Sequence, residues 1–126
     1  MWISIRTKRI KVSSRMRESV ESYIRRAFER ERRYVGSIVV GLRAAKLAGD
    51  IGYECRLAIW SHYLGLIVVR DVGDTIRTAV QQASLRAREV VRRRLHKRRG
   101  NGRRLKRDSF SRWLPTVASE ESKEGQ

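Results

Sequence analysis

The residues of this chain that could do chemistry are arginines, and the chemistry they offer is phosphate binding. The sequence has 30 Lys and Arg residues against 13 Asp and Glu, for a formal net charge of +17. Most of these cations are Arg, whose planar guanidinium fits phosphate oxygens and stacks on bases. A charge of this size attracts polyanions over a Debye length of ~8–10 Å. The candidate partners are nucleic acid, an anionic membrane and an acidic protein, and the Arg bias favours nucleic acid.

The densest run of cations lies at the C-terminal end of residues 75–99. This stretch has helical periodicity and one apolar stripe. Asp74 is the predicted N-cap. Glu89 is the only acid between Arg86 and Arg107, so the run lacks the acids of an ordinary salt-bridged surface. At Arg94 the stripe gives way to charge, and we expect the helix to leave its core there. The stripe consists of Ile76, Ala79, Val80, Ala83, Ala87, Val90 and Val91.

A second amphipathic helix is predicted from Ser13, its N-cap, to about Glu31. At 100° per residue, four arginines share one flank of its apolar stripe with no acid among them. We interpret this flank as a phosphate track. The opposite flank interleaves Glu18, Glu21 and Glu29 with arginines, which is typical of i,i+4 ion pairs. The track consists of Arg15, Arg26, Arg30 and Arg33.

The residues that usually carry catalysis are scarce. His62 and His96 have no neighbouring cluster of Asp, Glu or Cys that would complete a metal site. Cys55 is the only cysteine and lies between apolar neighbours, as a buried inert thiol does. No phosphate-binding glycine loop or nucleophile motif is present. We therefore expect no enzyme activity, no catalytic residue, no metal and no cofactor.

Strand periods around the two helices predict the fold class. Residues 2–12, 37–43, 53–60 and 64–70 alternate or are β-branched, and residues 44–52 are predicted to form a loop or a ragged hairpin turn. The order β-α-β-β-β-α predicts an α+β domain with a four-stranded mixed sheet and both helices on one face. The basic flanks would then meet in one surface, joining the phosphate track to Arg77, Arg88, Arg92 and Arg99.

The last part of the chain has a different composition. Gly100 and Gly102 are predicted to stop the long helix, and residues 100–126 to form a basic and then acidic disordered tail after a domain of residues 1–99. No apolar run approaches the ~20 residues of a membrane span. We expect a cytoplasmic protein with no membrane partner.

The chain resembles the hibernation-promoting factor and ribosome-associated inhibitor family in its short form, the ribosomal subunit interface proteins. The resemblance covers about residues 2–99 and rests on ISIR at 3–6, VSSRMRESV at 12–20, CRLAI at 55–59 and the helix at 76–94. It implies a domain that binds small-subunit rRNA, blocks the mRNA and tRNA channel, and acts in ribosome hibernation under stress. The positions matching the family's rRNA contacts are Arg15, Arg26, Arg30, Arg33, Arg86, Arg88, Arg92, Arg93 and Lys97.

Two other functions remain open from the residues. One is a general double-stranded-RNA-binding module, although such modules place a lysine cluster at the start of their last helix, where this chain has Asp74. The other is a protein-interaction module that self-associates weakly through the outer sheet face. Trp60, Val39 and Ile67 or Val69 would make that face apolar.

Overall fold

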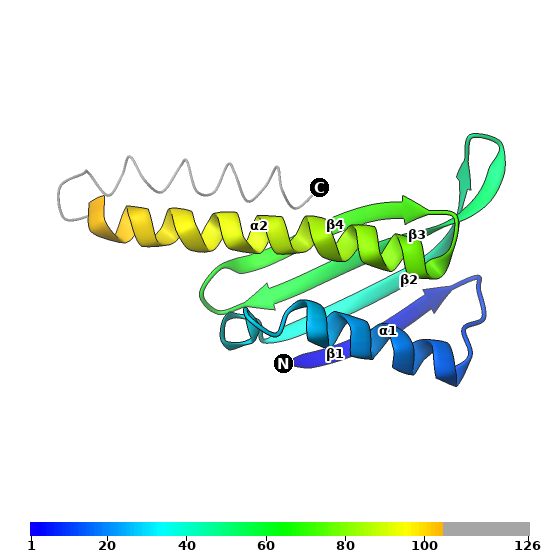
Figure 1. Cartoon of the computed structure of the whole chain (residues 1–126), viewed down its shortest axis with the longest axis horizontal. Helices are drawn as coiled ribbons and strands as arrows, with labels where there is room; N and C mark the ends of the chain where they lie inside the picture. Colours follow the sequence, from blue (N-terminus) through cyan, green and yellow to red (C-terminus); the bar gives the residue numbers. More distant parts are fainter. Residues whose placement is uncertain (105–126) are drawn as a thin grey trace.

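The chain folds into a four-stranded mixed sheet with two helices on one face (Figure 1). The computed structural model describes residues 1–104, without the side chains of Leu47 and of residues 99–104. The α+β class and the β-α-β-β-β-α order are confirmed. The elements are β1 (Trp2–Lys8), α1 (Ser14–Ala27), a short 3₁₀ helix η1 (Arg32–Tyr34), β2 (Ser37–Leu47), β3 (Asp50–Ser61), β4 (Gly65–Gly73) and α2 (Ile76–Arg104).

The strands lie in chain order, β1-β2-β3-β4. β1 and β2 are parallel and joined by α1, as the crossover rule requires, while β2–β3 and β3–β4 are antiparallel hairpins. Of the loop or ragged hairpin turn predicted at 44–52, the structure shows a hairpin, and it is longer than expected because β2 and β3 stay paired out to Leu47 and Asp50. Only Ala48 and Gly49 turn the chain, with φ of 46° and 89°. Two successive residues of positive φ match the twist of a tight hairpin.

The ends of α1 are partly as predicted. Ser13 caps its N-terminus, since its Oγ accepts from the Met16 N–H at 3.1 Å. The helix ends at Ala27 and not near Glu31. Tighter turns follow, in which the N–H of Glu31 donates to the Phe28 carbonyl. The predicted first strand is also too long, because β1 ends at Lys8 and the next residue, Arg9, has φ of 61°.

Both predicted ends of α2 are wrong. Thr75, and not Asp74, caps the helix, because its Oγ1 accepts from the Thr78 N–H at 3.0 Å. The helix also passes through Gly100 and continues to Arg104. A glycine costs a helix interior only ~1 kcal/mol, and no proline follows to enforce a stop. The rest of the predicted tail, 105–126, lies outside the described residues.

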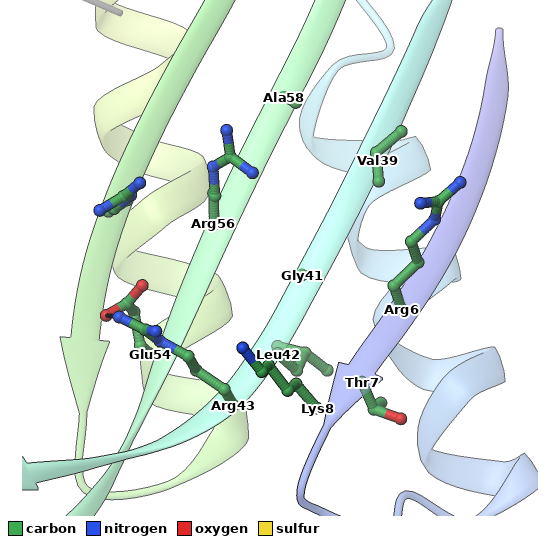
Figure 2. Close-up of a pocket in the computed structure, with 11 residues that line it drawn as sticks. Arg6, Thr7, Lys8, Val39, Gly41, Leu42, Arg43, Glu54, Arg56 and Ala58 are labelled. Carbon is green, nitrogen blue, oxygen red and sulfur yellow. Dashed lines mark hydrogen bonds and ion pairs between the residues drawn. The ribbon is translucent and has the colours of Figure 1, made fainter. Parts of the chain in front are cut away.

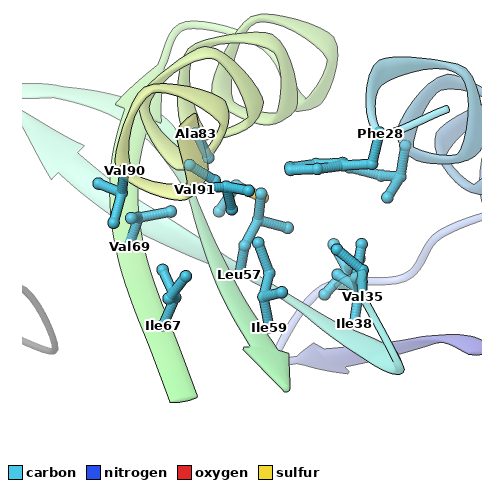
Figure 3. Packing of buried hydrophobic residues seen from close by; sticks show 14 of the residues in the cluster. Phe28, Val35, Ile38, Leu57, Ile59, Ile67, Val69, Ala83, Val90 and Val91 are labelled. Carbon is cyan, nitrogen blue, oxygen red and sulfur yellow. The ribbon is translucent and has the colours of Figure 1, made fainter. Parts of the chain in front are cut away.

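The core fills the layer between the helices and the inner face of the sheet (Figure 3). The predicted stripe of α2 is confirmed, with Ala79, Ala83 and Ala87 fully buried. The expectation that α2 leaves its core at Arg94 is wrong, since Leu95 is still only 8% exposed. α1 contributes its own stripe to the same cluster, and Cys55, Leu57 and Ile59 of β3 are buried as the predicted alternation requires. The other buried members from α1, the residue that follows it and the strands include Val20, Ile24, Phe28, Ile38, Val40, Ile67 and Val69.

β4 and α2 approach each other closely where the chain passes from one to the other. A Cβ added to Gly73 would lie 2.7 Å from the backbone nitrogen of Ala79. Only glycine therefore fits at the end of β4 without moving the start of the helix. This contact helps to fix the position of α2 over β3 and β4, and so the direction of its cationic side chains.

The outer face of the sheet is covered by neither helix. Ile67 and Val69, expected as candidates for this face, point into the core instead. The alternation places Leu66 and Val68 outside, beside Trp60 and Ala58 of β3. Within residues 1–104, neither helix carries an apolar stretch long enough to cross a bilayer.

Candidate nucleic-acid interface

The two helices run side by side in the same direction (Figure 1). A hollow of about 270 Å³ lies between them. Arg26 of α1 and Arg77 of α2 line it, with Ser19 and Gln81. Met16, Val20, Tyr23 and Val80 complete the lining. The structure therefore brings together one predicted arginine from each helix. Their guanidinium groups form no ion pair with any described residue.

Further along α2, Arg88 and Arg92 also face the α1 side, where they flank a buried carboxylate. The Nε atoms of Arg88 and Arg92 each lie 3.9 Å from Oε1 of Glu31, which is 4% exposed. That oxygen accepts no hydrogen bond. An acid thus lies within a surface that was predicted to have none. Neither helical spacing nor composition indicates it, because Glu31 follows the end of α1.

The predicted phosphate track of α1 is divided by the early end of the helix. Beyond Ala27 the 100° spacing no longer applies, so Arg30 and Arg33 leave the flank of Arg26. They line a different hollow, beside Met1 at the start of β1. Arg15 is exposed in the first turn of α1, and helical spacing keeps it on the flank of Arg26. The opposite flank carries the predicted i,i+4 pair between Arg25 and Glu21, at 3.0 Å.

The cations of α2 do not all face α1. Arg86 lies on the far flank, where its Nη1 donates to the carbonyl of Arg70 in β4. Helical spacing places Arg93 and Lys97 on the flank of Arg86. The side chain of Arg99 lies outside the described part of the chain. The expected single surface is therefore two: Arg26, Arg77, Arg88 and Arg92 on the inter-helix side, and Arg86, Arg93 and Lys97 on the β4 side.

Near the end of the sheet, arginines of α2 hold the hairpin between β3 and β4. Nη1 of Arg94 lies within hydrogen-bonding distance of the Leu64 and Leu66 carbonyls, at 3.5 and 3.3 Å. The guanidinium of Arg98 lies 4.5 Å from the ring centroid of Tyr63. Arg94 and Arg98 therefore make contacts within the protein, so not every arginine of this run is available to bind a partner.

The structure places Cys55 where the sequence predicts it, fully buried on the inner face of β3. Burial, with smaller contributions from the carboxylates of Asp71 and Glu54, raises the pKa of its thiol to about 12. Such a thiol is protonated at neutral pH and is a poor nucleophile. Among residues 1–104, no three His, Cys, Asp or Glu side chains gather as a metal site would require.

Comparison with known proteins adds no relative to these observations. No protein-family model matches the chain, and a search of curated proteins finds no match.

Proposed function

We propose that the protein is a ribosome-associated translation inhibitor that binds small-subunit rRNA through the inter-helix surface of α1 and α2. In this proposal it blocks the channel used by mRNA and tRNA, as the resemblance to the hibernation-promoting factor family implies. The observation that carries the proposal is the convergence of Arg26 and Arg77 on one hollow between the helices. Arg88 and Arg92 extend the same side of α2.

The charge of this surface fits an rRNA backbone. Among the described residues, Glu31 is the acid that lies within ion-pairing distance of these four arginines, and it contacts Arg88 and Arg92 but not Arg26 or Arg77. Cations spread along two parallel helices can contact successive phosphates of a folded RNA, which are recognised by shape and charge. The inter-helix surface is smaller than the one expected from the sequence, since Arg86, Arg93 and Lys97 lie on the β4 side of α2.

The test is co-sedimentation of the full chain with purified small ribosomal subunits. Arg26→Glu with Arg77→Glu should abolish pelleting at low salt. The control is Lys11→Glu with Lys46→Glu, which makes the same change in net charge at two exposed lysines. Binding by the wild type should fall with salt, with a log–log slope of ~0.7–0.9 for each phosphate neutralised.

Two results would count against the proposal. If the control variant loses binding as fully as the helix variant, the interaction depends only on net charge. If a plain RNA duplex competes as well as the subunit itself, the general double-stranded-RNA-binding alternative is favoured.

A further inference from the structure

The open face of the sheet carries a row of arginines that crosses all four strands. Strand pairing sets Arg6 beside Gly41, Gly41 beside Arg56, and Arg56 beside Arg70. Because the strands are ~4.8 Å apart, the row is about 14 Å long. The three arginines are exposed and form no ion pair with any described residue. None of them belongs to the helix surface discussed above.

A hollow of about 330 Å³ lies at the centre of this row (Figure 2). Figure 2 shows Gly41 leaving the space between the side chains of Arg6 and Arg56 empty. The backbone does not require glycine here, because Gly41 is not among the residues of positive φ. Packing does not require it either, since an added Cβ would meet nothing closer than 3.8 Å. A glycine inside a strand weakens it and often marks close approach by a ligand.

The chemistry around the hollow selects an anion. Lys8 and Arg43 add two cations to the three of the row, and Glu54 is the single acid in the lining. That acid is already neutralised, because its Oε2 lies 2.9 Å from Nη2 of Arg43. The lining therefore has five cations and one carboxylate, a net charge of +4. Apposing two such faces would repel, which disfavours the weak homodimer predicted for this face.

Exposed aromatic side chains lie on the same face at one end. Strand pairing sets Trp2 beside Ser37, Ser37 beside Trp60, and Trp60 beside Leu66. Trp2 is 72% exposed and Trp60 48%. This row is four residues along the strands from the arginines, about 13 Å away. Flat aromatic rings beside a cationic groove are the combination that binds unpaired bases together with their backbone.

We propose that the open face of the sheet binds a single strand of nucleic acid, with a phosphate over Gly41 and a base stacked on Trp60. Arg6, Arg56 and Arg70 then donate hydrogen bonds to backbone oxygens. A duplex does not fit this description, because its bases are stacked on one another and unavailable to Trp60. The proposal needs no contact made by α1 or α2, so it stands apart from the proposed rRNA surface.

The probe is a labelled single strand of about ten nucleotides, oligo(U) in one arm and oligo(dT) in the other, added to the full chain and followed by anisotropy. The decisive variant is Gly41→Glu, which adds a carboxylate at the hollow, where an added Cβ meets nothing closer than 3.8 Å. We expect its affinity to fall by about tenfold or more, because phosphate loses charge-assisted hydrogen bonds and meets a like charge. The arms show whether RNA, DNA or both are bound.

Two controls separate the effect of placing a charge in the hollow from the effects of filling the hollow and of lowering the net charge. Gly41→Gln fills the same space without a charge, and Lys46→Gln makes the same one-unit change of net charge on the β2–β3 hairpin. Gly41→Gln should weaken binding by less than Gly41→Glu does, because it obstructs the phosphate without repelling it, and Lys46→Gln should weaken binding by less than about threefold. Trp60→Leu should weaken it by about tenfold and should reduce the quenching of tryptophan fluorescence by the strand below that of the wild type, because the contribution of Trp60 is lost. Thermal unfolding of each variant verifies that it is folded.

The proposal is overturned if Gly41→Glu and Lys46→Gln weaken binding equally, or if the quenching in Trp60→Leu is as large as in the wild type. It is also overturned if sedimentation equilibrium finds a dimer that Gly41→Glu dissociates while oligonucleotide binding is unchanged. Arg26→Glu with Arg77→Glu separates the two proposals: it should abolish pelleting with small subunits and leave stacking on Trp60 intact.

Discussion

Oε1 of Glu31 lies 3.9 Å from Nε of Arg88, and both atoms are buried without a hydrogen bond. This carboxylate oxygen is therefore compensated by charge alone, at a distance longer than that of a direct hydrogen bond. A second cation, Arg92, approaches the same oxygen from the next turn of α2. This arrangement joins the end of α1 to α2 and reduces the charge that α2 offers to an anion.

Replacing Glu31 by Gln should tighten rRNA binding by about threefold, because Arg88 and Arg92 are released from the carboxylate and a negative charge is removed. The measurement is the dissociation constant for small subunits at fixed salt. Glu18→Gln is the matched control, since Glu18 is exposed and forms no ion pair with a described residue. Equal tightening by both variants would show that net charge, and not the position of Glu31, is responsible.

Charge reversal at Arg88 and Arg92 should destabilise the fold as well as affect binding. The double change to Glu removes both cations from a buried carboxylate and adds like charges, which should cost about 2–4 kcal/mol of unfolding free energy. Urea unfolding provides the measurement. Adding Glu31→Gln should restore about half of the loss or more, because the charge that needed compensation is then absent. No recovery in the triple variant would rule out the electrostatic explanation.

Gly73 and Gly41 should respond oppositely to alanine. At Gly73 the new Cβ meets Ala79 N at 2.7 Å and Thr78 Cγ2 at 2.8 Å, so Gly73→Ala should cost about 1–3 kcal/mol as the start of α2 shifts. At Gly41 the nearest atom is 3.8 Å away, and Gly41→Ala should stabilise by about 0.5–1 kcal/mol. Denaturant midpoints of the two variants check this contrast. Destabilisation by Gly41→Ala would mean that the glycine serves packing and not ligand approach.

The sheet was predictable because the residue pattern that defines a strand lies within a short segment of the sequence. Alternation with period two placed Cys55, Leu57 and Ile59 on one face of β3, and the structure buries all three. The order of elements then fixed the parallel pair and the two hairpins. The apolar stripe of α2 was readable for the same reason, since seven apolar residues at helical spacing leave little choice of buried face.

The candidate site was less predictable because it depends on where elements end. A helical wheel extended six residues past Ala27 put Arg30 and Arg33 on a flank that they do not occupy. The burial of Glu31 depends on the turn after α1, which no periodicity encodes. The hollow over Gly41 depends on register across strands distant in sequence, and pairing of Arg6 with Gly41 is not visible in either strand alone.

Cys55 gives the stability of the protein a specific dependence on pH. Its pKa is raised in the folded state, from 9.0 to about 12, chiefly by burial. The folded state therefore holds this proton more tightly than the unfolded state does. The stabilisation is fully present below pH ~9 and is lost as pH rises through the window from ~9 to ~12. Over that window the wild type should lose more unfolding free energy than Cys55→Ala, which lacks the group.

The measurement is urea unfolding at a series of pH values, with the difference between wild type and Cys55→Ala as the readout. Taking the difference removes the titration of Tyr, Lys and other groups that both proteins share. A thiol reagent added near pH 8 should react with the unfolded wild type and only slowly with the native one, because the native thiol is protonated and covered. Parallel pH profiles for the two proteins, or rapid labelling of the native chain, would show that β3 opens readily enough to expose Cys55 to water.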